Sequence, residues 1–324
     1  MTRRVLVMNR LVAAACVLAW LLPSPVFGQS VGFTPPRTPW GDPDLQGAYT
    51  NSDESLTPLE RPDQLAGRRL EDFTEAELLE LRKERSDERV EADRQRWELR
   101  SPLHWFENHD PKNSRAWLVV DPPDGKVPAQ VPQARLRFAA REAARAGRGP
   151  ADSYEDRSLY DRCITRGLPG SMMPAIYGNA YQIVQGPGYI ALIYEMVHET
   201  RIISVDGRPA LGPTIRQYMG DARGRWEGTT LVVETTNFTD KTPYRGSTEH
   251  LKITERFTPV TPDTVEWAVT FTDPETWTRP WTFAMNLTRK DDSQQPFEYA
   301  CHEGNLGLEF ILRAARAEEK AVGR

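Results

Sequence analysis

The feature that most constrains this chain is a series of short apolar runs between residues 161 and 304, separated by turn-forming pairs. Runs of this kind at roughly 8–12-residue spacing are typical of antiparallel strands joined by tight turns. The runs lie at 189–203, 215–219, 230–238, 251–257, 264–271, 281–287 and 297–301. About eight strands in sequence predict a mainly β fold, either an antiparallel up-and-down barrel or a strongly coiled sandwich.

Proline is frequent in the chain, with 26 Pro against 22 Gly, which argues against a long helical bundle. Residues 29–160 contain many charged residues and prolines. We predict that they form an irregular, partly helical region that wraps a β-barrel domain at 161–324. Helices are predicted at 71–100, at 132–146 and after Asn305, with a short strand at 116–120. Thr74 and Glu77 have the spacing of a capping box, and Asn305 is a suitable cap for the C-terminal helix.

Residues 1–28 have the order of regions found in a secretory signal peptide. Three arginines come first, an apolar run of 12 residues follows at 11–22, and Pro23 ends that run. Twelve apolar residues are too few to span a bilayer comfortably. We therefore predict a mature chain that begins at Gln29, has no membrane span and is periplasmic or secreted. A membrane anchor left in place is the alternative.

Removing the leader changes the charge and the cysteine count. The leader holds three of the 41 basic residues and none of the 46 acidic ones, which leaves 38 against 46 and a net charge of -8. An acidic chain with no basic run is not expected to bind nucleic acid. One of the three cysteines also leaves, and an even pair in an oxidising compartment predicts a disulfide between Cys163 and Cys301. Two free buried thiols are the alternative.

Composition and motifs exclude several classes of protein. An apolar fraction of 39% is enough to fill a core, which excludes wholesale disorder. The chain has no Gly-rich phosphate loop, no paired CxxC, no HExxH and no GxSxG. Nucleotide hydrolysis, Rossmann-type redox chemistry and serine-hydrolase chemistry therefore lack their usual residues.

Residues 194–201 (YEMVHETR) place ionisable groups within a predicted strand. Strand alternation predicts that Tyr194 and His198 share one face, and that Glu199 and Arg201 share the other. Ionisable groups on both faces are costly in a dry barrel, so we predict that at least one face is wet or forms a site. The alternative is an exposed strand with a Glu199–Arg201 salt bridge outside and a hydrogen-bonded His198 inside.

His302 and Glu303 lie where the last predicted strand leads into the C-terminal helix. Such positions line the mouth of a barrel, and a disulfide at Cys301 would hold them firmly. A histidine acts as a general acid or base near neutral pH, and a neighbouring carboxylate sets its tautomer. Together, His198 and His302 with one carboxylate would also suit a divalent metal. The spacing does not require a metal, and we predict no cofactor.

Aromatic residues form the third group of candidates. Four tryptophans lie within 56 residues, beside several charged side chains. Tryptophan faces with polar neighbours suit stacking on a sugar or an aromatic ring. The candidate ligand-binding residues are Glu199, Arg201, Trp226, Trp267, Arg279 and Trp281. The alternative for 273–281 is a well-packed turn in which Asp273 bridges Arg279.

Seven segments across nearly the whole mature chain resemble those of a group of exported proteins common in soil bacteria. They are PDLQGAYTN (43–51), TPLERP (57–62), CITRGLP (163–169), HETRII (198–203), GDARGRWEGTTLVVETTNF (220–238), ERF (255–257) and EYACHEGN (298–305). The resemblance implies export and no particular reaction. The predicted barrel is also similar to calycin-type barrels, some of which bind apolar ligands and some of which catalyse hydration or isomerisation. That likeness is one of fold alone.

The leading hypothesis from the sequence is an exported, cofactor-independent enzyme acting on a small sugar or aromatic molecule. His198, His302, Glu303 and Tyr194 would perform acid–base chemistry at the barrel mouth, as in an elimination, hydration or isomerisation. The alternative is a periplasmic small-molecule-binding protein, in which the same polar residues orient a ligand without catalysis. A structural protein of the cell envelope is a third possibility.

Overall fold

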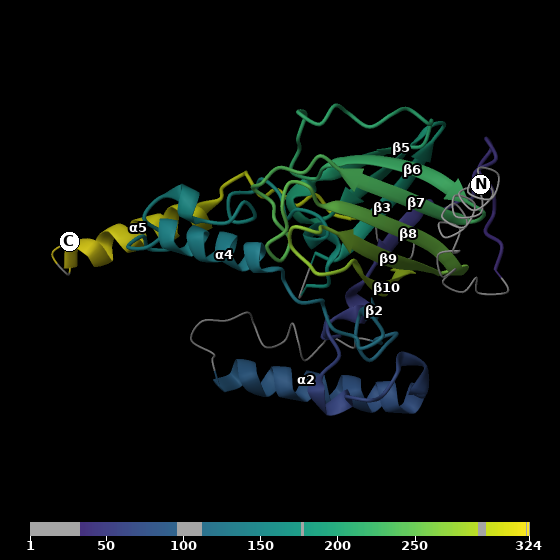
Figure 1. The fold of residues 1–324 in the computed structure, drawn as a ribbon, viewed down its shortest axis with the longest axis horizontal. Helices are drawn as coiled ribbons and strands as arrows, with labels where there is room; N and C mark the ends of the chain where they lie inside the picture. The colour runs from purple at the N-terminus through teal and green to yellow at the C-terminus, as the bar shows by residue number, and fades with distance from the viewer. Residues whose placement is uncertain (1–32, 96–111, 176–177, 291–295, 322, 324) are drawn as a thin grey trace, which may run out of the picture. The chain divides into compact units, whose positions relative to one another are not determined.

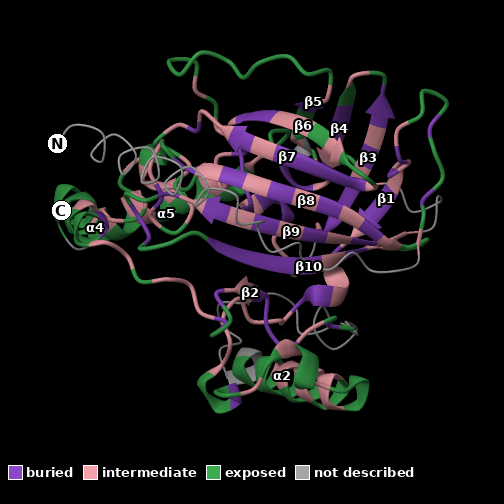
Figure 2. Ribbon diagram, turned by 45° about the vertical axis from the view of Figure 1, so that its right-hand side comes forward, coloured by how far each residue is buried: buried purple, intermediate pink, exposed green. Residues whose placement is uncertain are grey.

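The two longest strands follow from a strict alternation of apolar and polar residues. β8 (Lys252–Thr261) and β9 (Thr264–Thr272) bury every second residue over most of their length. Their antiparallel register places Phe257 opposite Trp267 and Ile253 opposite Phe271. Because side chains alternate across a strand, these large residues share one face, which becomes the inside of the fold (Figure 2).

The computed structural model describes residues 33–95, 112–175, 178–290, 296–321 and 323. Residues 34–324 form one unit. The predicted signal peptide at 1–28 lies outside the described residues.

Within the described residues, nine strands form a closed ring, which confirms the predicted barrel (Figure 1). In ring order they are β1 (Gly47–Thr50), β3 (Ala180–Gly186), β4 (Tyr189–Tyr194), β5 (Thr200–Ser204), β6 (Asp221–Glu227), β7 (Thr230–Thr236), β8, β9 and β10 (Trp281–Arg289). Pairing of β1 with both β3 and β10 closes the ring. A short strand, β2 (Val119–Asp121), pairs with the beginning of β10.

One pair of neighbours departs from the up-and-down order. β5 and β6 are parallel, with Ser204 opposite Arg223. Parallel neighbours require a connection that returns along the sheet, and residues 205–220 supply it as a long loop (Figure 1). The predicted strand at 215–219 is therefore wrong, because this segment is part of the return connection. It makes only a single bridge, between Gln217 and Phe238.

The predicted strand at 189–203 is two strands. β4 and β5 pair as an antiparallel hairpin, and the chain reverses through a short 3-10 turn at Met196–His198. Val197 has a φ of 63° in this turn. The turn interrupts the alternation from which Tyr194 and His198 were predicted to share a face, and the side chain of His198 lies outside the described residues.

The observed strands differ from the predicted ones in two further ways, one at each end of the strand order. The segment 297–301 forms no strand. Closure of the ring by β1 gives every one of the nine ring strands two neighbours. β1 and β3 were not predicted, because each is short or interrupted by glycine and glutamine.

Three α-helices match the predicted ones with shorter bounds. They are α2 (Glu75–Gln95), α4 (Pro132–Ala144) and α5 (Leu306–Ala321). The capping box is present, with the Glu77 amide donating to Thr74 Oγ1 at 3.3 Å and the Thr74 amide donating to Glu77 Oε2 at 2.9 Å. Asn305 Oδ1 accepts from the Leu308 amide at 3.2 Å, as a helix cap does. Among the helices described, none has the length and apolar character needed to cross a membrane.

The remaining short elements are 3-10 turns at Ser52–Glu54, Asp63–Leu65, Leu70–Asp72, Tyr154–Asp156 and Gly170–Met172. The predicted disulfide is confirmed: Cys163 and Cys301 are bonded, with their Cα atoms 5.6 Å apart. It joins the segment that precedes Gly170–Met172 to the segment that leads into α5.

Candidate functional site

None of the described side chains among the predicted catalytic residues lines a pocket. His302 and Glu303 lie in the turn before α5, and both are exposed. Tyr194, at the end of β4, is 1% exposed and points into the core. The backbone of His198 ends the 3-10 turn between β4 and β5, and its side chain lies outside the described residues. The acid–base mechanism assigned to these residues stays a prediction.

Glu199 and Arg201 have different bonding partners. The Glu199 carboxylate accepts hydrogen bonds from Thr165 Oγ1 at 2.8 and 2.9 Å and from Ser171 Oγ at 3.4 Å. Arg201 is 4% exposed and lies inside the ring. The salt bridge proposed between them on an exposed strand is therefore wrong.

Arg201 belongs to a buried ion pair that crosses the barrel interior. Its guanidinium donates to both Glu255 carboxylate oxygens, at 3.0 and 2.5 Å, and to Thr235 Oγ1 at 2.6 Å. Trp267 Nε1 donates to the same carboxylate at 3.1 Å. Burial lowers the pKa of Arg201, but the charge of Glu255, the neighbouring Tyr194 and the hydrogen bonds to them together raise that pKa above its ordinary value. Glu255 thus accepts three hydrogen bonds, and the pair is a structural crosslink between β5, β8 and β9.

Tyr194 lies beside this ion pair. Burial raises the pKa of its hydroxyl, while the nearby Arg201 charge acts in the opposite direction. Its ring meets that of Tyr181 edge-on, with centroids 6.1 Å apart. The hydroxyl oxygens of both tyrosines are buried and have no hydrogen-bond partner in the described part of the chain.

The aromatic candidates fall mostly in the core. Trp267 and Trp281 are each 0% exposed, and Trp281 stacks on Phe271 with centroids 4.4 Å apart. Trp226 is partly buried and packs against the same core. Arg279 lies on the outside and pairs with Asp121 at 3.1 Å, so the predicted bridge from Asp273 is not the one formed. Buried rings of this kind fill the barrel, which is the alternative raised for 273–281.

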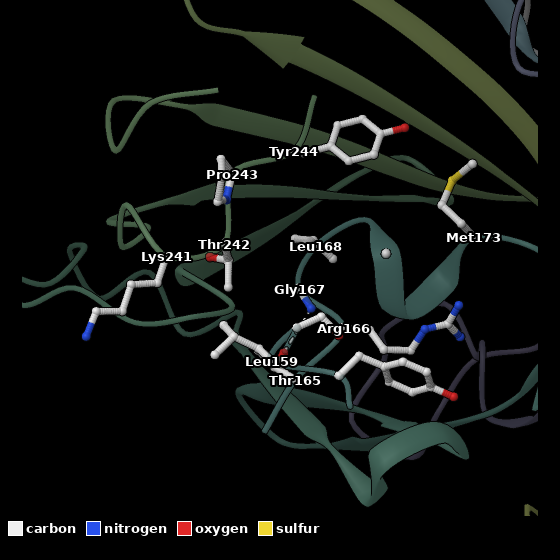
Figure 3. Close-up of a pocket in the computed structure, with 13 residues that line it drawn as sticks. Leu159, Thr165, Arg166, Gly167, Leu168, Met173, Lys241, Thr242, Pro243 and Tyr244 are labelled. Carbon is white, nitrogen blue, oxygen red and sulfur yellow. Dashed lines mark hydrogen bonds between the residues drawn. The ribbon is translucent and has the colours of Figure 1, made fainter. Parts of the chain in front are cut away.

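A pocket lies between two segments at one end of the barrel (Figure 3). One segment runs from 158 to 173 before β3, and the other, 241–244, lies between β7 and β8. The β7–β8 register places this second loop at the same end as the Met196–His198 turn, and Thr165 connects to Glu199 there. The cavity has a volume of about 450 Å³. We call it the Arg166 pocket. Its lining is Ser158, Leu159, Tyr160, Thr165, Arg166, Gly167, Leu168, Gly170, Met173, Lys241, Thr242, Pro243 and Tyr244.

Local contacts hold the first segment in place. The Thr165 hydroxyl accepts from the Gly167 amide at 2.9 Å and donates to Glu199. Gly167 has a φ of +68°, which favours glycine, and a Cβ there would lie 3.6 Å from Thr242 on the other segment. Cys163, two residues before Thr165, is tied to Cys301. The first wall of the pocket is thus held by a disulfide and by a buried hydroxyl, with a glycine at the position of positive φ.

Arg166 is a charged residue of this pocket with a hydrogen-bond donor that lacks an acceptor among the described residues. Its Nη1 is buried and has no hydrogen-bond partner among the described residues. Its guanidinium lies 5.3 Å from the ring centroid of Tyr160, and within the described ranges it makes no ion pair with a carboxylate. The Arg166 charge also lowers the pKa of Tyr181, against the larger effect of burial, which raises it. Lys241 extends away from the pocket (Figure 3).

Tyr244 connects the pocket to the core. Its ring stacks on Phe271 at 5.0 Å and on Trp281 at 6.3 Å, so Trp281 lies behind the pocket wall without lining it. Burial raises the pKa of Tyr244 to about 12, with the charge of Arg245 acting in the opposite direction. The hydroxyl therefore stays protonated at neutral pH. In Figure 3 it points toward Met173, above the guanidinium of Arg166.

Sequence reasoning missed Arg166 and Tyr244 as site residues. Arg166 belongs to the CITRGLP segment, which was noted for its resemblance and not for its chemistry. An arginine between a cysteine and a glycine-proline turn was the available signal. Tyr244 lies in a loop without any motif. Only its stacking on two core rings places it beside Arg166.

No group of three or more metal-ligating side chains occurs in the part of the chain that the structure describes. The predicted metal alternative involves His198, whose side chain lies outside that part. No family model, no curated protein and no solved structure matches this chain.

Proposed function

We propose that this chain is an exported protein that binds a small organic anion in the Arg166 pocket. The observation that carries the proposal is that Arg166, whose buried Nη1 has no hydrogen-bond partner among the described residues, lines a cavity of about 450 Å³. A buried donor without an acceptor is unfavourable, and an anion that accepts from it removes that cost. The leader-like residues 1–28 and the Cys163–Cys301 bond support export.

The rest of the lining suggests what the anion carries. Leu159, Leu168, Met173 and Pro243 present carbon surface, and Tyr244 adds an aromatic ring. Ligand sites of this size are commonly apolar, with a few polar groups that fix orientation. A carboxylate bound by Arg166, with an apolar or aromatic body against these side chains, fits both parts of the lining.

We rank binding ahead of acid–base catalysis for a specific reason. The described lining contains neither a histidine nor a carboxylate. The nearest carboxylate along the hydrogen-bond network is Glu199, and Thr165 separates it from the cavity. Catalysis by His198, His302 and Glu303 remains a second proposal, with its own readout below.

The test uses the mature chain, residues 29–324, and isothermal titration with benzoate, cinnamate and octanoate, each paired with its neutral amide. We expect at least one acid to bind and its amide to bind at least tenfold more weakly, because the amide cannot form a charge-assisted bond. Arg166→Met is expected to remove this preference, and Arg166→Lys to retain part of it. Arg208→Met is the control, because Arg208 is exposed and pairs only with Asp206 among the described residues.

Equal affinity for acids and amides, or an unchanged acid preference in Arg166→Met, would contradict the proposal. Nuclear magnetic resonance of the same mixtures reports any chemical conversion of a probe. Conversion that is lost in the double variant His198→Ala/His302→Ala would establish the second proposal instead. Conversion that survives in that variant removes the two histidines as catalysts.

A further inference from the structure

The C-terminal helix α5 exposes large apolar side chains. Leu306 is 53% exposed, Phe310 58% and Ile311 38%, and no residue of the helix is buried. Helices in proteins are stabilised mainly by packing an apolar face, and α5 is strongly amphipathic in sequence. An apolar face that is left uncovered on such a helix indicates a missing partner.

The other side of α5 already packs on its own chain. The Arg316 guanidinium donates to the carbonyl oxygens of Asp152 at 2.9 Å and Ala151 at 3.2 Å. Leu312 faces Tyr154 across a groove on this side. Glu309, Ala317 and Lys320 line the outer edge of the same groove, and the exposed side of the helix begins there. It carries Leu306, Phe310, Ala314, Ala317 and Ala321, which recur at intervals of three or four residues.

We propose that this surface pairs with the same surface of a second copy of the chain, with the two α5 helices antiparallel. The N-terminal half of this surface carries the large side chains of Leu306 and Phe310, and the C-terminal half carries only alanines. An antiparallel pair with a two-fold axis near Ala314 places Phe310 against Ala317 of the partner subunit, and Leu306 against Ala321 of the partner subunit. Large side chains then fill the space that small ones leave.

Charge along the helix fits the same arrangement. Glu309 and Lys320 lie eleven residues apart, which is close to three helical turns, so both flank the apolar surface on one side. In the antiparallel register, Glu309 faces Lys320 of the partner subunit, and the symmetry repeats this contact. Within one copy these two residues are too far apart to meet.

A second copy fits this surface better than a membrane does. α5 carries three basic residues (Arg313, Arg316 and Lys320) and three acidic ones (Glu309, Glu318 and Glu319), so its charges cancel. Helices that lie on anionic membranes have a basic polar face. A pair of helices of this length makes a small interface, so we expect a Kd in the micromolar range.

The experiment is sedimentation analysis of the mature chain, residues 29–324, from about 1 to about 200 µM. We expect a reversible monomer–dimer equilibrium that Phe310→Glu abolishes. Ile215→Glu is the matched control and leaves it unchanged, because Ile215 is 52% exposed in the loop between β5 and β6. Circular dichroism confirms that each variant is folded.

A charge exchange tests the register. Glu309→Lys and Lys320→Glu are each expected to weaken self-association at least tenfold. An equimolar mixture of the two variants is expected to form a heterodimer, because each copy then faces the opposite charge. A wild-type chain that stays monomeric throughout the range, or a dimer that Phe310→Glu does not affect, overturns the proposal. Cosedimentation with vesicles of anionic lipid that Phe310→Glu abolishes would assign the surface to a membrane instead.

Discussion

Two arginines at different places in this protein show what separates a structural charge from one available to a ligand. Arg201 lies inside the barrel and has Glu255 and Thr235 as partners. Arg166 lies at the barrel end, where its buried Nη1 has no partner among the described residues. Arg201 Nε is also without a hydrogen-bond partner among the described residues, so the two arginines differ in the counterion and not in complete hydrogen bonding. A buried charge that is paired with a carboxylate supports the fold, and removing one partner is costly. A charge that has no carboxylate partner leaves room for an anion.

The largest effect should come from breaking the bonded pair. Glu255→Ala leaves the Arg201 charge buried without a counterion, and we expect a loss of about 3–5 kcal/mol in the free energy of unfolding. Urea denaturation measures it. Glu234→Ala on β7 is the control, since Glu234 makes half-exposed ion pairs with Lys252 and Arg225 and should cost less than about 1 kcal/mol. Equal costs for the two variants would mean that the interior pair is not a crosslink.

Loss of the disulfide should have a smaller effect than loss of Glu255. We expect Cys163→Ala/Cys301→Ala to lose about 2–4 kcal/mol, because the bond restricts a long loop in the unfolded chain. The same variant should bind carboxylate probes more weakly, since Cys163 lies two residues before Thr165 in the pocket wall. Unfolding curves and titrations report the two quantities separately. Unchanged affinity in the folded variant would show that the bond does not support the pocket.

Replacing the two arginines tests the comparison directly. Arg166→Met has no ion pair to lose, so we expect the free energy of unfolding to change by less than about 1 kcal/mol. Arg201→Met leaves Glu255 buried and unpaired, and it should cost about 3–5 kcal/mol. Both variants are measured by the same urea titration. A large cost at Arg166 would mean that this residue serves the fold and not a ligand.

The smallest effect should appear only at high pH. Burial raises the pKa of Tyr244 to about 12, from an ordinary value near 10. The folded state therefore favours the protonated hydroxyl. This contribution to stability is fully present below pH 10 and is lost as the pH rises from about 10 through about 12. The absorbance difference between wild type and Tyr244→Phe at 295 nm should titrate near 12, and a midpoint near 10 would place Tyr244 in water.

Much of the fold was predictable from local pattern. The alternation in β8 and β9, the Thr74–Glu77 capping box and the Asn305 cap are encoded within a few residues each. The Cys163–Cys301 pairing followed from the even cysteine count. Strands β1 and β3 were missed because each depends on neighbours distant in sequence, and a four-residue strand has no periodicity to detect.

The candidate site was less predictable, for a reason that one turn illustrates. Alternation along 194–201 assumed a continuous strand, but Val197 adopts a positive φ and reverses the chain. Tyr194 and Arg201 consequently both face the interior, and Glu199 turns toward Thr165. The tryptophans were chosen for their chemistry, yet the barrel uses Trp267 and Trp281 to fill its core.

The sequence by itself determined the class of fold, the helix boundaries to within a few residues, and the disulfide, because these depend on residue spacing and on short-range hydrogen bonds. Only the tertiary structure decided which charged residues are satisfied. Arg166 and Arg201 look alike in the sequence, and each directly follows a threonine. Closure of the ring brings the Glu255 carboxylate of β8 within hydrogen-bond distance of Arg201. Among the described residues, no carboxylate pairs with Arg166, and its Nη1 has no partner. Burial and bonding are set by contacts between distant segments, and local sequence does not specify them.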